Sequence, residues 1–152
     1  MEVNRGSEWS KWDLHVHSPY TYLNGYQCSD NDFIAKLKEK NISVIGLTNY
    51  FKFTDEEYIL KEKLEKEGIT VFLNLELRLS YTNNNNDCCD FHVIFDNKLT
   101  KEDIQRFLSN LNINLSGTQI KAIDIDSSGM KRANVELDEL MNRLNEKSLK
   151  IH

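Results

Sequence analysis

The sequence predicts an α/β fold, an open sheet or a barrel, in which parallel strands are joined by crossover helices. Short apolar, β-branched runs alternate with segments of helical apolar spacing, in the order β-α-β-α-β-β-α through residue 111. The run 42–48 is nearly continuously apolar, which is typical of a strand buried on both faces of a parallel sheet. The 152 residues fit one domain or part of a larger one, with the regular pattern over 1–111 and a less regular strand and helix extension over 112–152.

The first strand, over 12–17, alternates apolar and polar residues, which predicts two different faces. We expect Trp12, Leu14 and Val16 to pack into the core, and Asp13, His15 and His17 to share the opposite face. Pro19 ends the strand because proline cannot donate a ladder hydrogen bond. The loop 20–30 leaves the strand at the end that carries His17, so it is expected to form a wall of any site there.

Two helices and two strands follow with clear boundary signals. Ser29 or Asp30 caps a helix over 31–40, which leads into the strand 42–48. A capping box over 54–57 begins the second helix, and Gly68 ends it. The run 69–77 is then predicted to be a strand.

The later elements are predicted from the same kinds of signal. The apolar run 91–95 predicts a strand, and Thr100 caps a helix that continues to 111. Beyond that point the pattern weakens, with a strand expected over 120–125 and a helix over 134–147. The polar run 83–87 indicates a hairpin-like or longer loop between two strands.

Composition narrows the range of partners and compartments. The net charge is −5, with 24 acidic and 19 basic residues, which argues against broad, non-specific binding of nucleic acid. A nucleotide or a nucleic-acid end remains an acceptable substrate if a metal supplies positive charge. The odd number of cysteines, 3, with Cys88 next to Cys89, indicates a reducing cytoplasm rather than a disulfide framework. No apolar run reaches transmembrane length, so we expect a soluble cytoplasmic protein without a membrane partner.

Polar side chains with metal-binding chemistry lie near the carboxyl ends of the predicted strands, where α/β folds place their sites. They are His15, His17, Asn49, Glu76 and His92. Imidazole and carboxylate ligands together suit Zn, Mn or Fe, and a glutamate can bridge two such divalent ions. Two bridged ions polarise a phosphoryl oxygen and activate water, which is the chemistry of phosphate-ester hydrolysis.

Each candidate also has a structural interpretation. The first strand can be a half-exposed strand that carries two histidines by chance. Glu76 can form an ion pair with Arg78, and His92 can be a hydrogen-bonded core histidine. Arg78 shares a face with Glu76 and can contact a substrate phosphate, although an ion pair is the more common role. Asp124 and Asp126 form a same-face pair for which a polar loop is the default, and a Cys88-Cys89 metal site lacks supporting spacing.

The segment 13–18 (Asp-Leu-His-Val-His-Ser) resembles the opening motif of PHP domains, the polymerase and histidinol phosphatase superfamily. Residues 46–50, Glu76 and His92 follow in the order and rough spacing of its later motifs. The fuller stretch 5–15 is similar to the N-terminal PHP segment of large bacterial proteins that continue into an AAA or SMC-like ATPase. The resemblance covers roughly residues 5–111.

The resemblance implies a distorted (β/α)7 TIM-like barrel with a two- or three-metal centre that hydrolyses phosphate esters. Such a barrel needs more than about 200 residues, so the resemblance implies that these 152 residues form an incomplete PHP-type barrel, a single partial domain with the barrel half over 1–111. By position, His15 and His17 match first-site ligands, Glu76 the bridging carboxylate and His92 a second-site ligand. The chain departs from the family at Asn49-Tyr50, where the family has Asp-His, and its loop 20–26 lacks the family's histidine. The later ligands are also absent, since only His152 follows His92 among the histidines.

Two functional hypotheses follow. The first is a metal-dependent phosphoesterase of nuclease or nucleotidase type that forms the N-terminal part of a larger ATPase-linked protein. Its catalytic metal centre would contain His15, His17, Glu76 and His92, with Arg78 and Asn49 contacting substrate. The alternative is a degenerate, non-catalytic PHP module that acts as a scaffold or regulatory domain for an attached or partner ATPase. In either case a half-closed barrel exposes a sheet edge, which a partner domain, a second copy in a homo-oligomer or the region 120–147 of this chain would cover.

Overall fold

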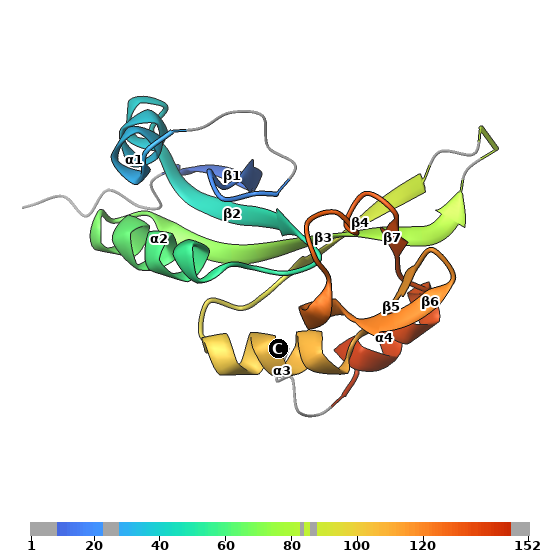
Figure 1. The fold of residues 1–152 in the computed structure, drawn as a ribbon. Coiled ribbons are helices and arrows are strands. Elements are labelled where there is room, and N and C mark those ends of the chain that lie inside the picture. Colours follow the sequence, from blue (N-terminus) through green and yellow to red (C-terminus); the bar gives the residue numbers. More distant parts are fainter. Residues whose placement is uncertain (1–8, 23–27, 83, 86–87, 147–152) are drawn as a thin grey trace, which may run out of the picture.

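The structure is a computed structural model that describes residues 9–22, 28–82, 84–85 and 88–146 (Figure 1). The elements of the larger, N-terminal part are β1 (Lys11–His17), α1 (Asp30–Glu39), β2 (Ile42–Tyr50), α2 (Asp55–Lys66), β3 (Thr70–Thr82) and β4 (Cys88–Ile94). They are followed by α3 (Lys101–Asn110), β5 (Asn112–Leu115), β6 (Thr118–Lys121), the 3₁₀ turn η1 (Ala122–Asp124), β7 (Ala133–Asn134) and α4 (Leu137–Leu144). Figure 1 shows α3 and α4 grouped with the small sheet, while α1 and α2 accompany the large one.

The large sheet is a curved, mixed sheet with the strand order β1-β2-β3-β4. β1, β2 and β3 are parallel, and α1 and α2 provide their crossovers, as the sequence predicts. β4 is antiparallel to β3, so the prediction of parallel strands is wrong for this strand. The cause is the short connection over 83–87, because a parallel crossover needs a dozen or more residues. The fold is thus a partial, barrel-like sheet rather than a closed barrel.

The predicted helix boundaries are confirmed within one residue for the first three helices. The Ser29 hydroxyl caps α1 by accepting the Asp32 N–H. Thr54 and Glu57 form the predicted capping box of α2, and Thr100 begins an equivalent arrangement on α3. Gly68 follows α2 with φ of +81°, a left-handed conformation that glycine adopts without steric cost.

Side chains of β2 and β3 divide between two faces of the large sheet. On one face, Ile45 and Leu47 of β2 are fully buried in a core that includes Leu60 and Leu64 of α2. On the other face, Thr48 and Tyr50 of β2 stand beside Asn74 and Glu76 of β3, because these residues pair directly across the two strands. The polar face of the sheet is therefore the one that carries the candidate site.

The first strand differs from its predicted arrangement. Trp12 and Leu14 are 59% and 37% exposed rather than buried, and only Val16 packs partly against the core. β1 is an edge strand, and its pairing with β2 has an irregularity between Asp13 and Val16 that contains one extra residue. This bulge breaks the strict alternation on which the prediction rested.

Gly46 makes the bulge possible. A Cβ at this position would lie 2.1 Å from the backbone oxygen of Leu14, far inside van der Waals contact. Only a residue without a side chain allows β1 to approach β2 this closely. The glycine therefore determines the path of the strand that carries the two histidines.

The C-terminal part forms a second, antiparallel sheet of order β6-β5-β7. Its predicted strand over 120–125 is shorter, because β6 ends at Lys121 and η1 follows. The predicted helix over 134–147 begins only at Leu137 and ends at Leu144. Backbone hydrogen bonds from Ser80 to Val135 and from Val135 to Arg78 join this part to β3. Its apolar residues belong to the same core cluster as those of the large sheet.

Of the helices within the described residues, none is long and apolar enough to span a membrane.

We predict that Gly46→Ala destabilises the protein by about 2 kcal/mol, because the new methyl group displaces the Leu14 backbone. The free energy of unfolding in urea measures this effect. Ser43→Ala in the same strand is the matched control and should change stability by less than about 0.5 kcal/mol. Equal stabilities of the two variants would contradict the proposed constraint.

Glu57 provides a pH-dependent test of the core. Burial raises the pKa of its carboxyl, although hydrogen bonds from Ser18, Thr54 and Asn49 oppose the shift. A raised pKa means that the folded state binds more protons than the unfolded state at pH values above about 4.5, the ordinary pKa of glutamate. The contribution of Glu57 to stability therefore falls as the pH rises through this window. We expect the stability of the parent protein relative to Glu57→Gln to decrease from pH 4 to pH 7 in urea unfolding; a constant or increasing difference would refute this.

Candidate metal centre

Three ligand atoms converge on the polar face of the large sheet. The Nε2 atoms of His15 and His17 are 3.1 Å apart, and the Oε2 atom of Glu76 lies 3.1 Å from the first and 3.3 Å from the second. His15 and His17 come from the end of β1, and Glu76 comes from β3. These residues form a group that can hold a metal ion. We call His15, His17 and Glu76 the HHE cluster.

The dimensions of the HHE cluster fit one transition-metal ion. Ligand atoms about 2.1 Å from an ion lie about 3.0 Å apart at neighbouring octahedral positions and about 3.4 Å apart in a tetrahedral site. The three observed separations, 3.1, 3.1 and 3.3 Å, fall between these values. Two imidazoles and one carboxylate are also the mixed N and O donor set that Zn, Mn and Fe accept. Both the distances between the ligand atoms and their chemical types therefore fit a site for one transition-metal ion.

The Glu76 carboxylate supplies negative charge at the cluster. The Glu76 side chain is only 9% exposed, while those of His17 and His15 are 26% and 51% exposed. Burial opposes ionisation of Glu76, but the hydrogen bond from His17 and the charges of the surrounding histidines lower its pKa below the usual value. The carboxylate is therefore ionised at neutral pH and available to a metal.

His92 lies beside the HHE cluster without joining its group of converging atoms. It pairs with Glu76 across β3 and β4, and its ring centroid is 4.5 Å from that of His15. Its Nδ1 atom is 3.1 Å from Oδ1 of Asn74. Burial, followed by the charge of His15, lowers the pKa of His92. The structure thus brings all four predicted ligands close together, and the ligand atoms of three of them, those of the HHE cluster, converge on one point.

Two residues at the site were not proposed as site residues from the sequence. Tyr50 stacks on His17 with ring centroids 5.0 Å apart and an interplanar angle of 25°, and its hydroxyl is 3.5 Å from Nε2. Asn74 contacts His92. The sequence did contain a signal for Asn74. This residue lies two positions before Glu76 in the same strand, and the two-residue period of a strand places both side chains on one face.

The two predicted substrate contacts are placed differently. Arg78 lies on the face of Glu76, where its Nη1 donates to the Lys131 carbonyl at 2.7 Å and its Nε is 3.9 Å from an Asp90 oxygen. Its ion-pair partner is thus Asp90 rather than Glu76. Asn49 lies on the opposite, helix-covered face, where it is fully buried and donates to Glu57 at 2.8 Å. Its position therefore does not bring it to the HHE cluster.

The other polar candidates also lie apart from the cluster. Asp126 accepts hydrogen bonds from the Ser128 hydroxyl and the Gly129 N–H, which is the polar-loop arrangement expected as the default. Neither Asp126 nor Asp124 belongs to the metal-binding group found among the described residues. Cys88 and Cys89 are exposed free thiols. Of the loop 20–30, residues 23–27 lie outside the described residues, so its role as a site wall stays a prediction.

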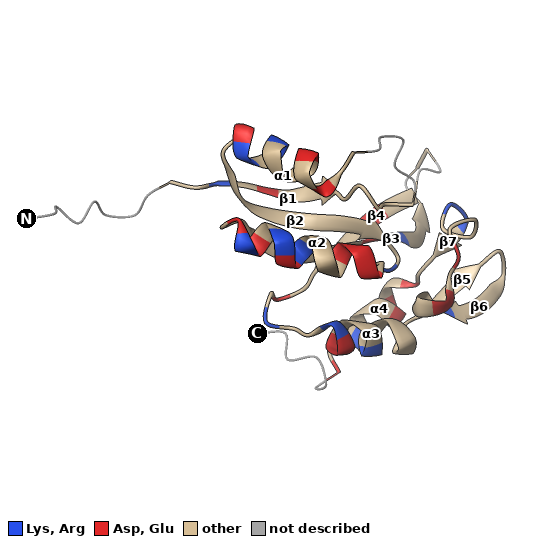
Figure 2. Ribbon diagram, turned by 60° about the vertical axis from the view of Figure 1, so that its left-hand side comes forward, with Lys and Arg blue, Asp and Glu red and all other residues tan. Residues whose placement is uncertain are grey.

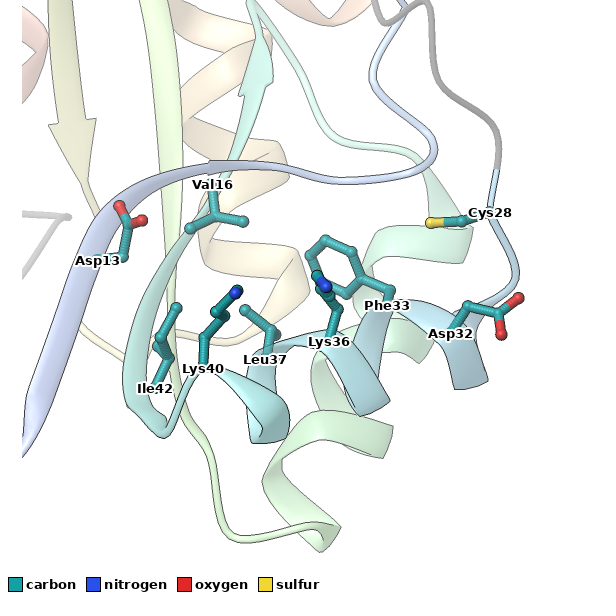
Figure 3. A pocket seen from close by; sticks show the side chains of 9 residues that line it. All are labelled: Asp13, Val16, Cys28, Asp32, Phe33, Lys36, Leu37, Lys40 and Ile42. Carbon is teal, nitrogen blue, oxygen red and sulfur yellow. The ribbon is translucent and has the colours of Figure 1, made fainter.

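A separate hollow of about 470 Å³ lies between β1 and α1 (Figure 3). Asp13 and Val16 of β1 line it together with Phe33 and Leu37 of α1. Asp13 therefore shares a side of the strand with Val16, whereas the prediction grouped it with His15 and His17. The bulge between Asp13 and Val16 explains the difference. An inserted residue shifts the alternation by one, so the side chains that follow it point to the opposite faces from those predicted.

No protein-family model and no curated protein matches the chain. Among solved structures, the chain is similar to the crystal structure of a "putative metal-dependent phosphoesterase" from Bifidobacterium adolescentis, with 14% sequence identity and a TM-score of 0.45. The match covers 67% of this chain and 33% of that protein. The chain thus spans about a third of the length of the protein that it matches. The similarity is one of backbone arrangement.

We predict that the purified protein binds a transition metal and that the double variant His15→Ala/His17→Ala loses it, because two of the three converging ligands disappear. Elemental analysis after dialysis measures the metal content per chain. Cys88→Ser/Cys89→Ser is the control and should retain the metal. Metal retained by the histidine variant, or lost by the cysteine variant, would place the ion elsewhere.

Proposed function

We propose that this chain contributes the metal centre of a metal-dependent phosphoesterase. The observation that carries the proposal is the HHE cluster, with two imidazole nitrogens and one ionised carboxylate oxygen at metal-ligand separations. The resemblance of residues 13–18 to the opening PHP motif supports the same chemistry. Metal ions bound here would polarise a phosphoryl oxygen and activate water for attack on phosphorus.

The residues of the chain have distinct roles in this proposal. His15, His17 and Glu76 hold a divalent ion of Mn, Zn or Fe type. His92, beside His15, would serve a second ion if the centre is complete. The low exposure of Glu76 keeps its charge in a partly dehydrated setting, where attraction for a cation is stronger than in water. Arg78, on the same face, is a proposed contact for a substrate phosphate.

A nucleotide or a nucleic-acid end is the proposed substrate class. Acidic and basic residues are interspersed along α1, α2 and α3 (Figure 2), and the net charge is −5. Such a surface favours local recognition of a phosphate at the metal centre over tracking along a polyanion. The predicted association with an attached or partner ATPase, and with a second copy of the chain, rests on the sequence resemblance and the open sheet edge.

The second candidate is a degenerate module without catalytic activity, which binds metal weakly or not at all and acts as a scaffold or regulatory domain. Three observations favour it. The His15 side chain is 51% exposed, so bulk water reaches the cluster, and only three ligand atoms converge among the described residues. Tyr50 also stands where the PHP resemblance leads one to expect histidine, and its ring is packed against His17.

Hydrolysis of bis(p-nitrophenyl) phosphate with Mn²⁺ separates the two candidates. We expect release of p-nitrophenol by the parent protein and a loss of at least about 100-fold in Glu76→Gln, since the amide removes the anionic ligand. Glu62→Gln on the exposed surface of α2 removes the same charge away from the site and should retain activity.

Stoichiometric metal binding without hydrolysis of the diester, or of p-nitrophenyl phosphate, would favour the non-catalytic module. Hydrolysis that persists in Glu76→Gln would refute the proposed centre. Absence of bound metal from the parent protein would exclude the phosphoesterase and would leave the non-catalytic module, which need not bind metal.

A further inference from the structure

Asn74 occupies a central position beneath the HHE cluster. Its side chain is buried, with the residue only 1% exposed, in a strand that is otherwise largely apolar on both sides of it. It contacts the three other strands of the large sheet. Its Nδ2 lies 2.8 Å from the Leu14 carbonyl of β1 and 3.1 Å from the Thr48 hydroxyl of β2, and its Oδ1 lies 3.1 Å from Nδ1 of His92 in β4.

These contacts determine the orientation of the Asn74 amide. The Leu14 carbonyl oxygen can only accept a hydrogen bond, so the amide atom that faces it must be the nitrogen. The Thr48 hydroxyl donates its own proton to the Gly46 carbonyl and is free to accept from the same nitrogen. The amide oxygen is then the atom that faces His92, since it is the other polar atom of the same planar group.

The orientation of the amide has a consequence for His92. An amide oxygen has no proton to give, so the hydrogen bond at 3.1 Å requires the proton to reside on Nδ1 of His92. In a neutral imidazole the other nitrogen, Nε2, then carries the lone pair. A metal can bind only the nitrogen that carries the lone pair, so Asn74 determines which atom of His92 is able to act as a ligand.

The other end of the amide acts on His15. Leu14 lies in the bulge of β1, with its carbonyl oxygen directly over Gly46. The hydrogen bond from Asn74 holds this carbonyl across the width of β2. His15 is the next residue, so the same side chain that sets the proton of His92 also anchors the backbone from which His15 projects.

We propose that Asn74 is the positioning residue of the centre: its amide holds His92 in the Nδ1–H tautomer and anchors the β1 bulge that presents His15. The proton position and the anchoring are properties of the metal-free chain. Their benefit to catalysis rests on the proposed phosphoesterase function.

NMR of the ¹⁵N-labelled, metal-free protein tests the proposal directly. Two-bond ¹H–¹⁵N spectra distinguish the Nδ1–H from the Nε2–H tautomer, and the His92 signals are identified by their loss in His92→Gln. We expect the Nδ1–H form for His92 in the parent protein and a shift toward the Nε2–H form in Asn74→Leu, which lacks an acceptor. An Nε2–H form in the parent protein, or an unchanged His92 spectrum in Asn74→Leu, would overturn the proposal.

Two further variants separate positioning from folding. Asn74→Asp keeps an acceptor for Nδ1 and should preserve the His92 tautomer, even if the loss of the donor to Leu14 lowers stability. Thr48→Val removes one partner of the amide without touching His92 and should leave the tautomer unchanged. Loss of the Nδ1–H form in both variants alike would show that it depends on general packing, and would overturn the specific role of the amide.

Metal titration provides the functional readout. We expect Asn74→Leu to bind Mn²⁺ or Zn²⁺ about 10- to 100-fold more weakly than the parent protein, as for the loss of other groups that orient metal ligands. Unchanged affinity together with the altered tautomer would overturn the role in metal binding. Failure of the parent protein to bind metal would refute the proposed function, while the NMR result would still decide the tautomer.

Discussion

The approach of the Leu14 carbonyl to Gly46 is the contact on which the site depends. The missing side chain at Gly46 lets β1 bulge over β2, and the bulge sends Asp13 and Val16 to one side of the strand while His15 and His17 face the other. Without the extra residue, a strict alternation would have placed Asp13 beside the two histidines. A local backbone feature thus selects which side chains of the first strand meet Glu76.

The open form of the sheet explains the exposure of the site. Four strands curve without closing, and β1 and β4 are both edges. Trp12 and His15 on β1 and Ile94 on β4 are consequently exposed to an extent that the interior of a closed barrel would not permit. The HHE cluster is therefore half shielded, with Glu76 buried in the sheet and His15 at its margin. This partial exposure is compatible with a catalytic metal centre to which another protein segment adds ligands. It is also compatible with a site that binds a metal without catalysis.

Buried polar groups beneath both faces of the sheet hold the arrangement together. On the helix-covered face, Glu57 collects hydrogen bonds from Ser18, Asn49 and the backbone of Thr54. On the polar face, Asn74 links β1, β2 and β4. An unsatisfied buried group is costly, so each of these networks favours one relative position of its strands over slipped alternatives. These networks therefore fix the positions of the strands that carry the ligands of the candidate centre.

The sequence by itself determined the helices and strands through residue 111, the boundaries of the first three helices and the four candidate ligands on the strands. Helix caps at Ser29, Thr54 and Thr100, and the strands that carry His15, His17, Glu76 and His92, follow from patterns within a few residues of each position. Tertiary structure decided what depends on distant partners. The Asp13 side chain, the exposure of Trp12 and the burial of Asn49 follow from the bulge, the sheet edge and Glu57. These are contacts between segments far apart in the chain, on which local periodicity carries no information.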